Sequence, residues 1–161
     1  MEPLEIVPLD GSFLRRIDSE EPWTEKVSKY VPILGWIVQS HLWTKRVGPI
    51  RRRLCNQLIS RPRSIRRFWE GDAMFLTIAQ TVCEVAQTEM GWPCASFVPE
   101  DPFEVVFWSY EDGLDAVAAL IELEDHFGCA LPDEVAEYFV ERTLGEFVAY
   151  LAERSSALIN P

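Results

Sequence analysis

The stretch DGLDAVAALIELEDHFGCALPDE, residues 112–134, decides the fold of this chain. Residues 112–127 predict a helix, because Asp112 suits an N-cap, Asp115 follows it as in a capping box, and Gly128 suits the C-terminal end. The apolar residues recur at helical spacing, so we expect one side of this helix to face the core. That side would consist of Leu114, Val117, Ala118, Leu120, Ile121 and Leu123.

Helical patterns also lie on both sides of this stretch. Asp72 suits the N-cap of a helix over residues 73–90, which Gly91 would end. After the turn at Leu131-Pro132-Asp133 we expect a short helical segment over 134–140. The motif Thr143-Leu144-Gly145-Glu146 is a capping box that predicts the last helix. No strand alternation occurs, so the predicted class is all-α.

The rest of the chain adds a loop and an N-terminal extension. Residues 92–111 combine three prolines with many aromatic residues, so we expect a long loop packed on the core, with a helical turn near residues 102–106. In the extension, helices are predicted over 22–30, 33–47 and 49–60. The last of these has Ile50, Leu54 and Leu58 at four-residue spacing, with Ile59 beside them, and a basic outer face.

Residues 73–153 together resemble the acyl carrier protein family. In that family the second helix opens with Asp-Ser-Leu, Ile-Pro-Asp-Glu follows it, and a Thr-Val pair caps the fourth helix. The matching motifs here are Asp112-Gly113-Leu114, Leu131-Pro132-Asp133-Glu134 and Thr143-Leu144. The resemblance implies an all-α fold, an acyl-carrier-like four-helix bundle with an N-terminal basic helical extension.

The position that gives the family its chemistry is altered in this chain. Carrier proteins attach phosphopantetheine to the serine of Asp-Ser-Leu, and the equivalent residue here is Gly113. Glycine has no hydroxyl group, so no phosphodiester can form there, and we expect no cofactor. The nearest serine, Ser109, does not stand at the helix entrance. A true acyl carrier that uses another serine remains an alternative.

The resemblance also implies an interaction face. In the family the acidic second helix docks on basic patches of partner enzymes. The matching residues, besides Asp112 at the helix entrance, are Asp115, Glu122, Glu124 and Asp125. Taken singly, such carboxylates are more typical of a solvated helix surface. Taken together, they favour a non-catalytic interaction or regulatory protein that binds a partner with a basic surface.

Charge divides the chain into two parts, although the net charge of the whole is −11. Residues 1–69 carry 13 Lys and Arg against 7 Asp and Glu, a net of +6, whereas residues 70–161 carry 2 against 19, a net of −17. We therefore predict a basic and apolar helical extension over 1–71 and an acidic bundle over 72–161. The acidic part would attract a basic partner at long range.

The basic charge of the extension is concentrated between residues 44 and 68. Three partners compete for it: the phosphates of a nucleic acid, an anionic membrane surface that also accepts the apolar residues 30–43, and the acidic half of this chain or of another protein. The negative net charge argues against nucleic acid. Docking on the acidic half is the simplest interpretation, because both charge signs are already present. The patch consists of Lys45, Arg46, Arg51, Arg52, Arg53, Arg61, Arg63, Arg66 and Arg67.

No catalytic constellation is present in the sequence. It has no nucleophile elbow, no phosphate-binding loop and no dinucleotide fingerprint, so we expect no enzyme. His126 and Cys129 could share a helical face, but nothing else at ligand spacing supports a metal site. No apolar run approaches the roughly 18 residues of a spanning helix, and the first residues are acidic. A cytoplasmic location with reduced thiols is the expectation.

Overall fold

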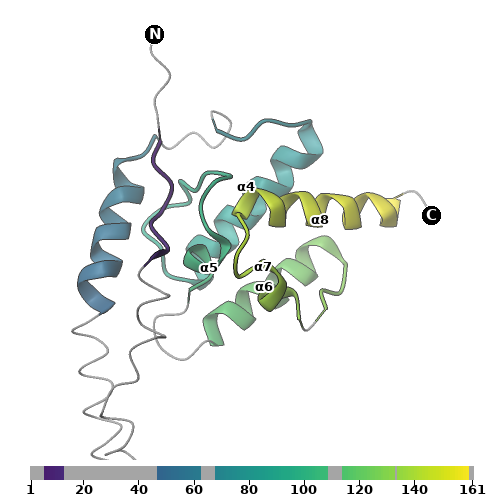
Figure 1. The fold of residues 1–161 in the computed structure, drawn as a ribbon. Coiled ribbons are helices and arrows are strands. Elements are labelled where there is room, and N and C mark those ends of the chain that lie inside the picture. Colours follow the sequence, from purple (N-terminus) through teal and green to yellow (C-terminus); the bar gives the residue numbers. More distant parts are fainter. Residues whose placement is uncertain (1–5, 13–46, 63–67, 109–113, 133, 160–161) are drawn as a thin grey trace, which may run out of the picture.

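The fold comes from a computed structural model, in which residues 6–12, 47–62, 68–108, 114–132 and 134–159 are described (Figure 1). The helices expected over 22–30 and over most of 33–47 lie outside these residues. Within the described ranges the chain is helical and forms no strand, so the all-α prediction is confirmed. The helices, besides one over residues 47–60, are α4 (Ala73–Glu89), α5 (Phe103–Val106), α6 (Leu114–Phe127), α7 (Val135–Phe139) and α8 (Leu144–Ile159).

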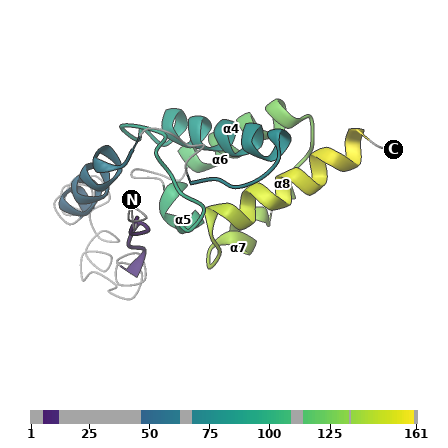
Figure 2. The same ribbon diagram turned by 90° about the horizontal axis from the view of Figure 1, so that it is seen from above.

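Helix α4 is the central element, with α6 and α8 both packed against it (Figures 1 and 2). Its ends follow the sequence prediction. The Asp72 carboxylate accepts a hydrogen bond from the Phe75 N–H at 2.8 Å, and the helix ends where Gly91 adopts a φ of 64°. Glycine reaches this left-handed conformation at little cost, which makes it a common residue after a helix.

Helix α8 begins at the predicted capping box. The Thr143 N–H donates to Glu146 at 2.8 Å, and the Glu146 N–H donates to the Thr143 hydroxyl at 3.3 Å. Gly145 allows this end of the helix to approach the loop before α5, because a Cβ there would lie 3.0 to 3.3 Å from Pro99. The Gly145 and Leu144 N–H groups donate to the carbonyls of Pro99 and Asp101, both at 2.8 Å. The loop and α8 are thus joined through the backbone.

The aromatic loop between α4 and α6 forms part of the core, as the sequence predicted. Trp92 and Phe97 are buried, and the predicted helical turn is α5. Phe103 and Phe107 of this region pack with Phe147 of α8 at ring-centroid distances of 4.9 and 5.7 Å, and with each other at 4.7 Å. Large buried rings contribute much of a core's hydrophobic stabilisation. The loop therefore packs on α8 as part of the core.

Three details of the predicted helices were wrong. In α6, Leu120 and Leu123 pack on the core as expected, joined by Ala119, whereas four other residues expected there are exposed: Leu114, Val117, Ala118 and Ile121. Both faces of this helix are apolar, so spacing alone could not select the inner one. Ile59 is 60% exposed, because it lies about 100° around the helix from the buried Leu58. That helix is already formed at Val47, whose side chain is fully buried, and it tolerates Pro49 in an early turn.

One hydrophobic core includes residues from both charge regions of the chain. Leu9, Leu54, Leu58 and Trp69 belong to the same buried cluster as the apolar residues of α4, α6 and α8. The division at residues 71 and 72 stays a prediction. What the described residues show is that apolar side chains on both sides of it pack together.

Candidate interaction face on helix α6

The outer surface of α6 carries a stripe of exposed apolar side chains. Leu114 is 66% exposed, Val117 53% and Ile121 52%. These residues are three and four positions apart, so they lie one above the other on a single face. We call these three residues, with the small Ala118 between them, the α6 apolar stripe. Contiguous exposed apolar surface is typical of an interaction site.

The predicted acidic residues occupy different positions around this stripe. Glu122 and Asp125 are exposed and lie three residues apart on one flank. Asp115 is half-buried at the start of the helix. Glu124 is half-buried on the other flank, where its carboxylate accepts a hydrogen bond from the Leu131 N–H. Glu124 therefore also holds the loop that follows the helix.

His126 and Glu122 lie close together on the surface near the C-terminal end of the stripe. His126 Nδ1 lies 3.4 Å from the Glu122 carboxylate and 3.0 Å from the Glu122 carbonyl oxygen. Both side chains are about half exposed. A surface pair of this kind contributes little to stability.

The carrier-site equivalent lies mostly outside the described residues. Asp112 and Gly113 are not described, and neither is Ser109, while Leu114 is the first residue of α6. The absence of a hydroxyl at position 113 is a property of the sequence itself. The described part of the motif therefore contributes an exposed leucine at the top of the α6 apolar stripe.

The described arginines of the basic segment divide between interior and surface. Arg61 is buried and Arg51 is half-buried, whereas Arg52 and Arg53 are exposed. Arg51 donates hydrogen bonds to the carbonyls of Met90 and Gly91 and lies 4.6 Å from the centroid of the Trp92 ring. The other predicted members, Lys45, Arg46, Arg63, Arg66 and Arg67, lie outside the described residues.

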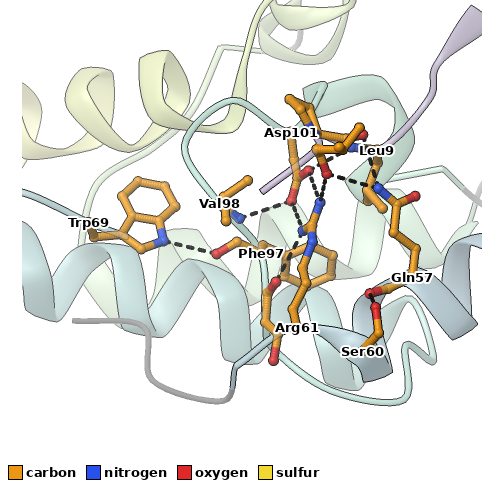
Figure 3. Close-up of polar contacts among 11 residues, drawn as sticks. Leu9, Gln57, Ser60, Arg61, Trp69, Phe97, Val98 and Asp101 are labelled. Carbon is orange, nitrogen blue, oxygen red and sulfur yellow. Dashed lines mark hydrogen bonds and ion pairs between the residues drawn. The ribbon is translucent and has the colours of Figure 1, made fainter. Parts of the chain in front are cut away.

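Arg61 forms a buried ion pair with Asp101 (Figure 3). Its two terminal nitrogens lie 2.7 and 2.8 Å from the two carboxylate oxygens, and neither side chain is more than 4% exposed. Asp101 also accepts the N–H groups of Leu9 and Val98 at 2.8 and 2.9 Å. Arg61 further donates to the carbonyls of Val7 and Ser96 at 2.9 and 3.1 Å. Bidentate pairing with extra hydrogen bonds is the geometry that a buried charge pair requires.

This ion pair connects three parts of the chain that are far apart in sequence. The N-terminal segment 6–12 runs beside the 47–60 helix in Figure 1, and Gln57 donates to its Val7 and Pro8 carbonyls at 2.9 and 3.1 Å. Sequence reasoning placed Arg61 in a basic patch and favoured docking of that patch on an acidic half, but it did not single out Asp101. A signal was present: an aspartate in a loop rich in aromatic residues, and an arginine at the end of an amphipathic helix.

Searches for two other kinds of site gave no candidates. Among the described residues, no three or more His, Cys, Asp or Glu side chains are grouped so that they could hold a metal ion. In the same part of the chain, no helix has the length and apolar character needed to cross a membrane.

The fold and the α6 face define a small helical bundle whose second long helix presents both apolar and acidic side chains. No family model matches the chain, and no solved structure matches it. Among curated proteins, the chain is 34% identical over 80 residues to the acyl carrier protein of Rubrobacter xylanophilus, which covers 50% of this chain and 94% of that protein. The chain therefore belongs to the acyl carrier protein family, through its C-terminal half.

Proposed function

We propose that this chain is a non-catalytic member of its family that works as an interaction or regulatory module through the exposed face of α6. The observation that carries the proposal is the α6 apolar stripe beside Glu122 and Asp125. Apolar contact would provide most of the affinity, and the carboxylates would orient a partner that surrounds an apolar patch with Lys and Arg. We place this interaction in the cytoplasm, as the sequence led us to expect.

The absence of the attachment serine supports the non-carrier part of this proposal. Gly113 has no hydroxyl group that could form a phosphodiester. Docking through the exposed face of α6 does not need such a group. A protein that binds a partner but carries no acyl group needs the docking helix and does not need the covalent arm. The alternative, an adaptor for membranes or polyanions, would rely on arginines of which Arg51 and Arg61 are already engaged inside the protein.

A mass measurement tests the covalent part. The full chain is incubated with a phosphopantetheinyl transferase and coenzyme A, beside a family member that has the Asp-Ser-Leu serine as the positive control. We expect no mass addition on this chain and an addition on its Gly113→Ser variant, because the variant restores the missing hydroxyl. A phosphopantetheine adduct on the unaltered chain would show that another serine carries the arm and would overturn the non-carrier assignment.

Matched variants test the docking face. Proteins from a lysate are captured on the unaltered chain, on Ile121→Arg and on Met74→Arg, which changes an exposed apolar residue of α4 instead. We expect Ile121→Arg to lose a captured protein that Met74→Arg retains, and higher salt to weaken the capture. Equal capture by all three chains would contradict the assignment of the partner site to α6.

A further inference from the structure

Two half-buried cysteines lie on neighbouring parts of the structure that the sequence separates by almost forty residues. Cys55 belongs to the 47–60 helix, and Cys94 belongs to the loop between α4 and α5. Both are free thiols, and both pack against the same hydrophobic core. Arginine side chains hold the two segments together before and after the two cysteines.

Arginine contacts set the register of the helix against the loop. At one end Arg51 reaches the carbonyls of Met90 and Gly91, and at the other Arg61 reaches the carbonyl of Ser96 at 3.1 Å. From residue 51 to residue 61 a helix rises about 15 Å. The chain from residue 91 to residue 96 spans at most about 18 Å. The two segments therefore run side by side in the same direction between the two arginine contacts.

The cysteines fall at corresponding places in this register. Cys55 follows Arg51 by one helical turn, so it lies on nearly the same face and about 6 Å further along. Cys94 follows Gly91 by three residues, so it lies within about 11 Å of it along the loop. Both thiols thus lie between the two arginine contacts. The environment of the Cys55 thiol includes both neighbours: burial raises its pKa, Arg51 lowers it, and Cys94 raises it again.

We propose that Cys55 and Cys94 are a redox-sensitive pair, which a low-molecular-weight disulfide converts into an intramolecular disulfide that fastens the 47–60 helix to the loop between α4 and α5. This proposal rests on the packing of these two segments and is independent of the function of α6.

The reaction is a pair of thiol–disulfide exchanges. One cysteine thiolate attacks a sulfur of the small disulfide, forms a mixed disulfide and releases one small thiol. The second cysteine, as its thiolate, attacks the protein sulfur of that mixed disulfide and releases the second small thiol. Two protein thiols are thereby oxidised and one small disulfide is reduced to two thiols. Because the thiolate is the nucleophile, the rate rises about tenfold per pH unit while the thiols remain mostly protonated.

The test uses the full, reduced chain under conditions in which circular dichroism shows it folded. It is incubated with excess oxidised glutathione, and the remaining thiols are then blocked and the peptides mapped by mass spectrometry. We expect a linked peptide that contains Cys55 and Cys94 and is two hydrogens lighter than the two reduced peptides together, and we expect a reductant to reverse the link. Cys129→Ser should leave this link intact, whereas Cys55→Ser should leave Cys94 as a glutathione adduct.

Three outcomes would overturn the proposal. They are folded protein in which both thiols stay free, protein that carries glutathione on Cys55 and Cys94 together, and a protein disulfide that joins another pair. Where the predicted link forms, a second measurement tests its structural effect. Closing the chain between residues 55 and 94 restricts the unfolded state, so the oxidised protein should melt at a higher temperature than the reduced one. A lower melting temperature would contradict a fastening role.

Discussion

Charged residues are used in opposite ways at the two ends of this molecule. At one end, Arg61 and Asp101 are buried and paired, and they join the N-terminal segment, the 47–60 helix and the loop before α5 (Figure 3). At the other, Glu122 and Asp125 of α6 remain exposed beside an apolar stripe. A charge that is buried must be paired, and breaking the pair destabilises the fold. An exposed charge is free to act on a partner.

The difference shows that the sign of the charge in each half of the chain does not by itself indicate which residues bind a partner. Part of the basic segment serves the interior, because Arg51 and Arg61 make their contacts with residues 90–101. The acidic helix uses Glu124 for a hydrogen bond within its own fold and leaves other carboxylates outside. Stability and binding should therefore respond to different substitutions, even within one helix.

The largest effect is expected from Arg61→Met. This change leaves the Asp101 carboxylate buried with only the Leu9 and Val98 N–H groups as donors, so we expect a loss of about 3 to 5 kcal/mol in the free energy of unfolding. Urea denaturation followed by circular dichroism measures it. The matched control is Arg52→Met on the exposed side of the same helix, which should change stability by no more than about 0.5 kcal/mol.

Two results would contradict this difference between buried and exposed arginines. If Arg61→Met and Arg52→Met lowered the free energy of unfolding by the same amount, the buried ion pair would not be what joins the segments. A small cost for both would mean that the chain repacks without the ion pair. The double variant Arg61→Met with Asp101→Leu sharpens the comparison: an apolar pair should recover the part of the loss that comes from the unpaired buried charge, while the Leu9 and Val98 N–H groups lose their acceptor.

A second comparison lies within α6. Leu123 is fully buried, so Leu123→Ala should lower the free energy of unfolding by about 2 to 5 kcal/mol. Ile121 is about half exposed, and Ile121→Ala should cost less than about 1 kcal/mol while weakening capture of the partner. Urea denaturation and capture measured on both variants would separate the two roles. If Ile121→Ala were the more destabilising change, the assignment of inner and outer faces would be reversed.

Features set by near neighbours in sequence could be predicted. Asp72 caps α4 through a residue three positions away, and Thr143 and Glu146 cap α8 over the same spacing. Gly91 follows α4 with the expected left-handed conformation. In each case the partner lies within one helical turn, so a local motif contains the whole interaction. The carrier-like arrangement of helices followed from a resemblance built on such motifs.

Features that depend on distant partners could not be predicted. Arg61 and Asp101 are 40 residues apart, and no local pattern relates them. The inner face of α6 was partly misassigned, because the helix is apolar on both sides and only its packing on α4 separates the buried Leu123 from the exposed Ile121. The acidic residues of the candidate site came from the family resemblance and stay predictions, whereas its apolar stripe was mistaken for core.

The smallest effect is expected at the surface, from Glu146→Gln. The carboxylate of Glu146 accepts the Thr143 N–H and lies 3.3 Å from Arg142, and the backbone hydrogen bond in particular lowers its pKa in the folded protein. A glutamine keeps an acceptor for the same N–H but has no charge to titrate. The variant should therefore be slightly less stable at neutral pH, as measured by thermal unfolding.

The pH dependence gives the sharper version of this test. A group whose pKa is lowered by folding contributes stability above its unfolded pKa, and this contribution is lost as the pH falls through the folded pKa. The difference between the unaltered chain and Glu146→Gln should therefore be present at pH 7 and should shrink as the pH falls below the ordinary range of glutamate. A difference that stays constant down to acidic pH would show that the amide acts through altered packing, and not through the loss of a charge at the start of α8.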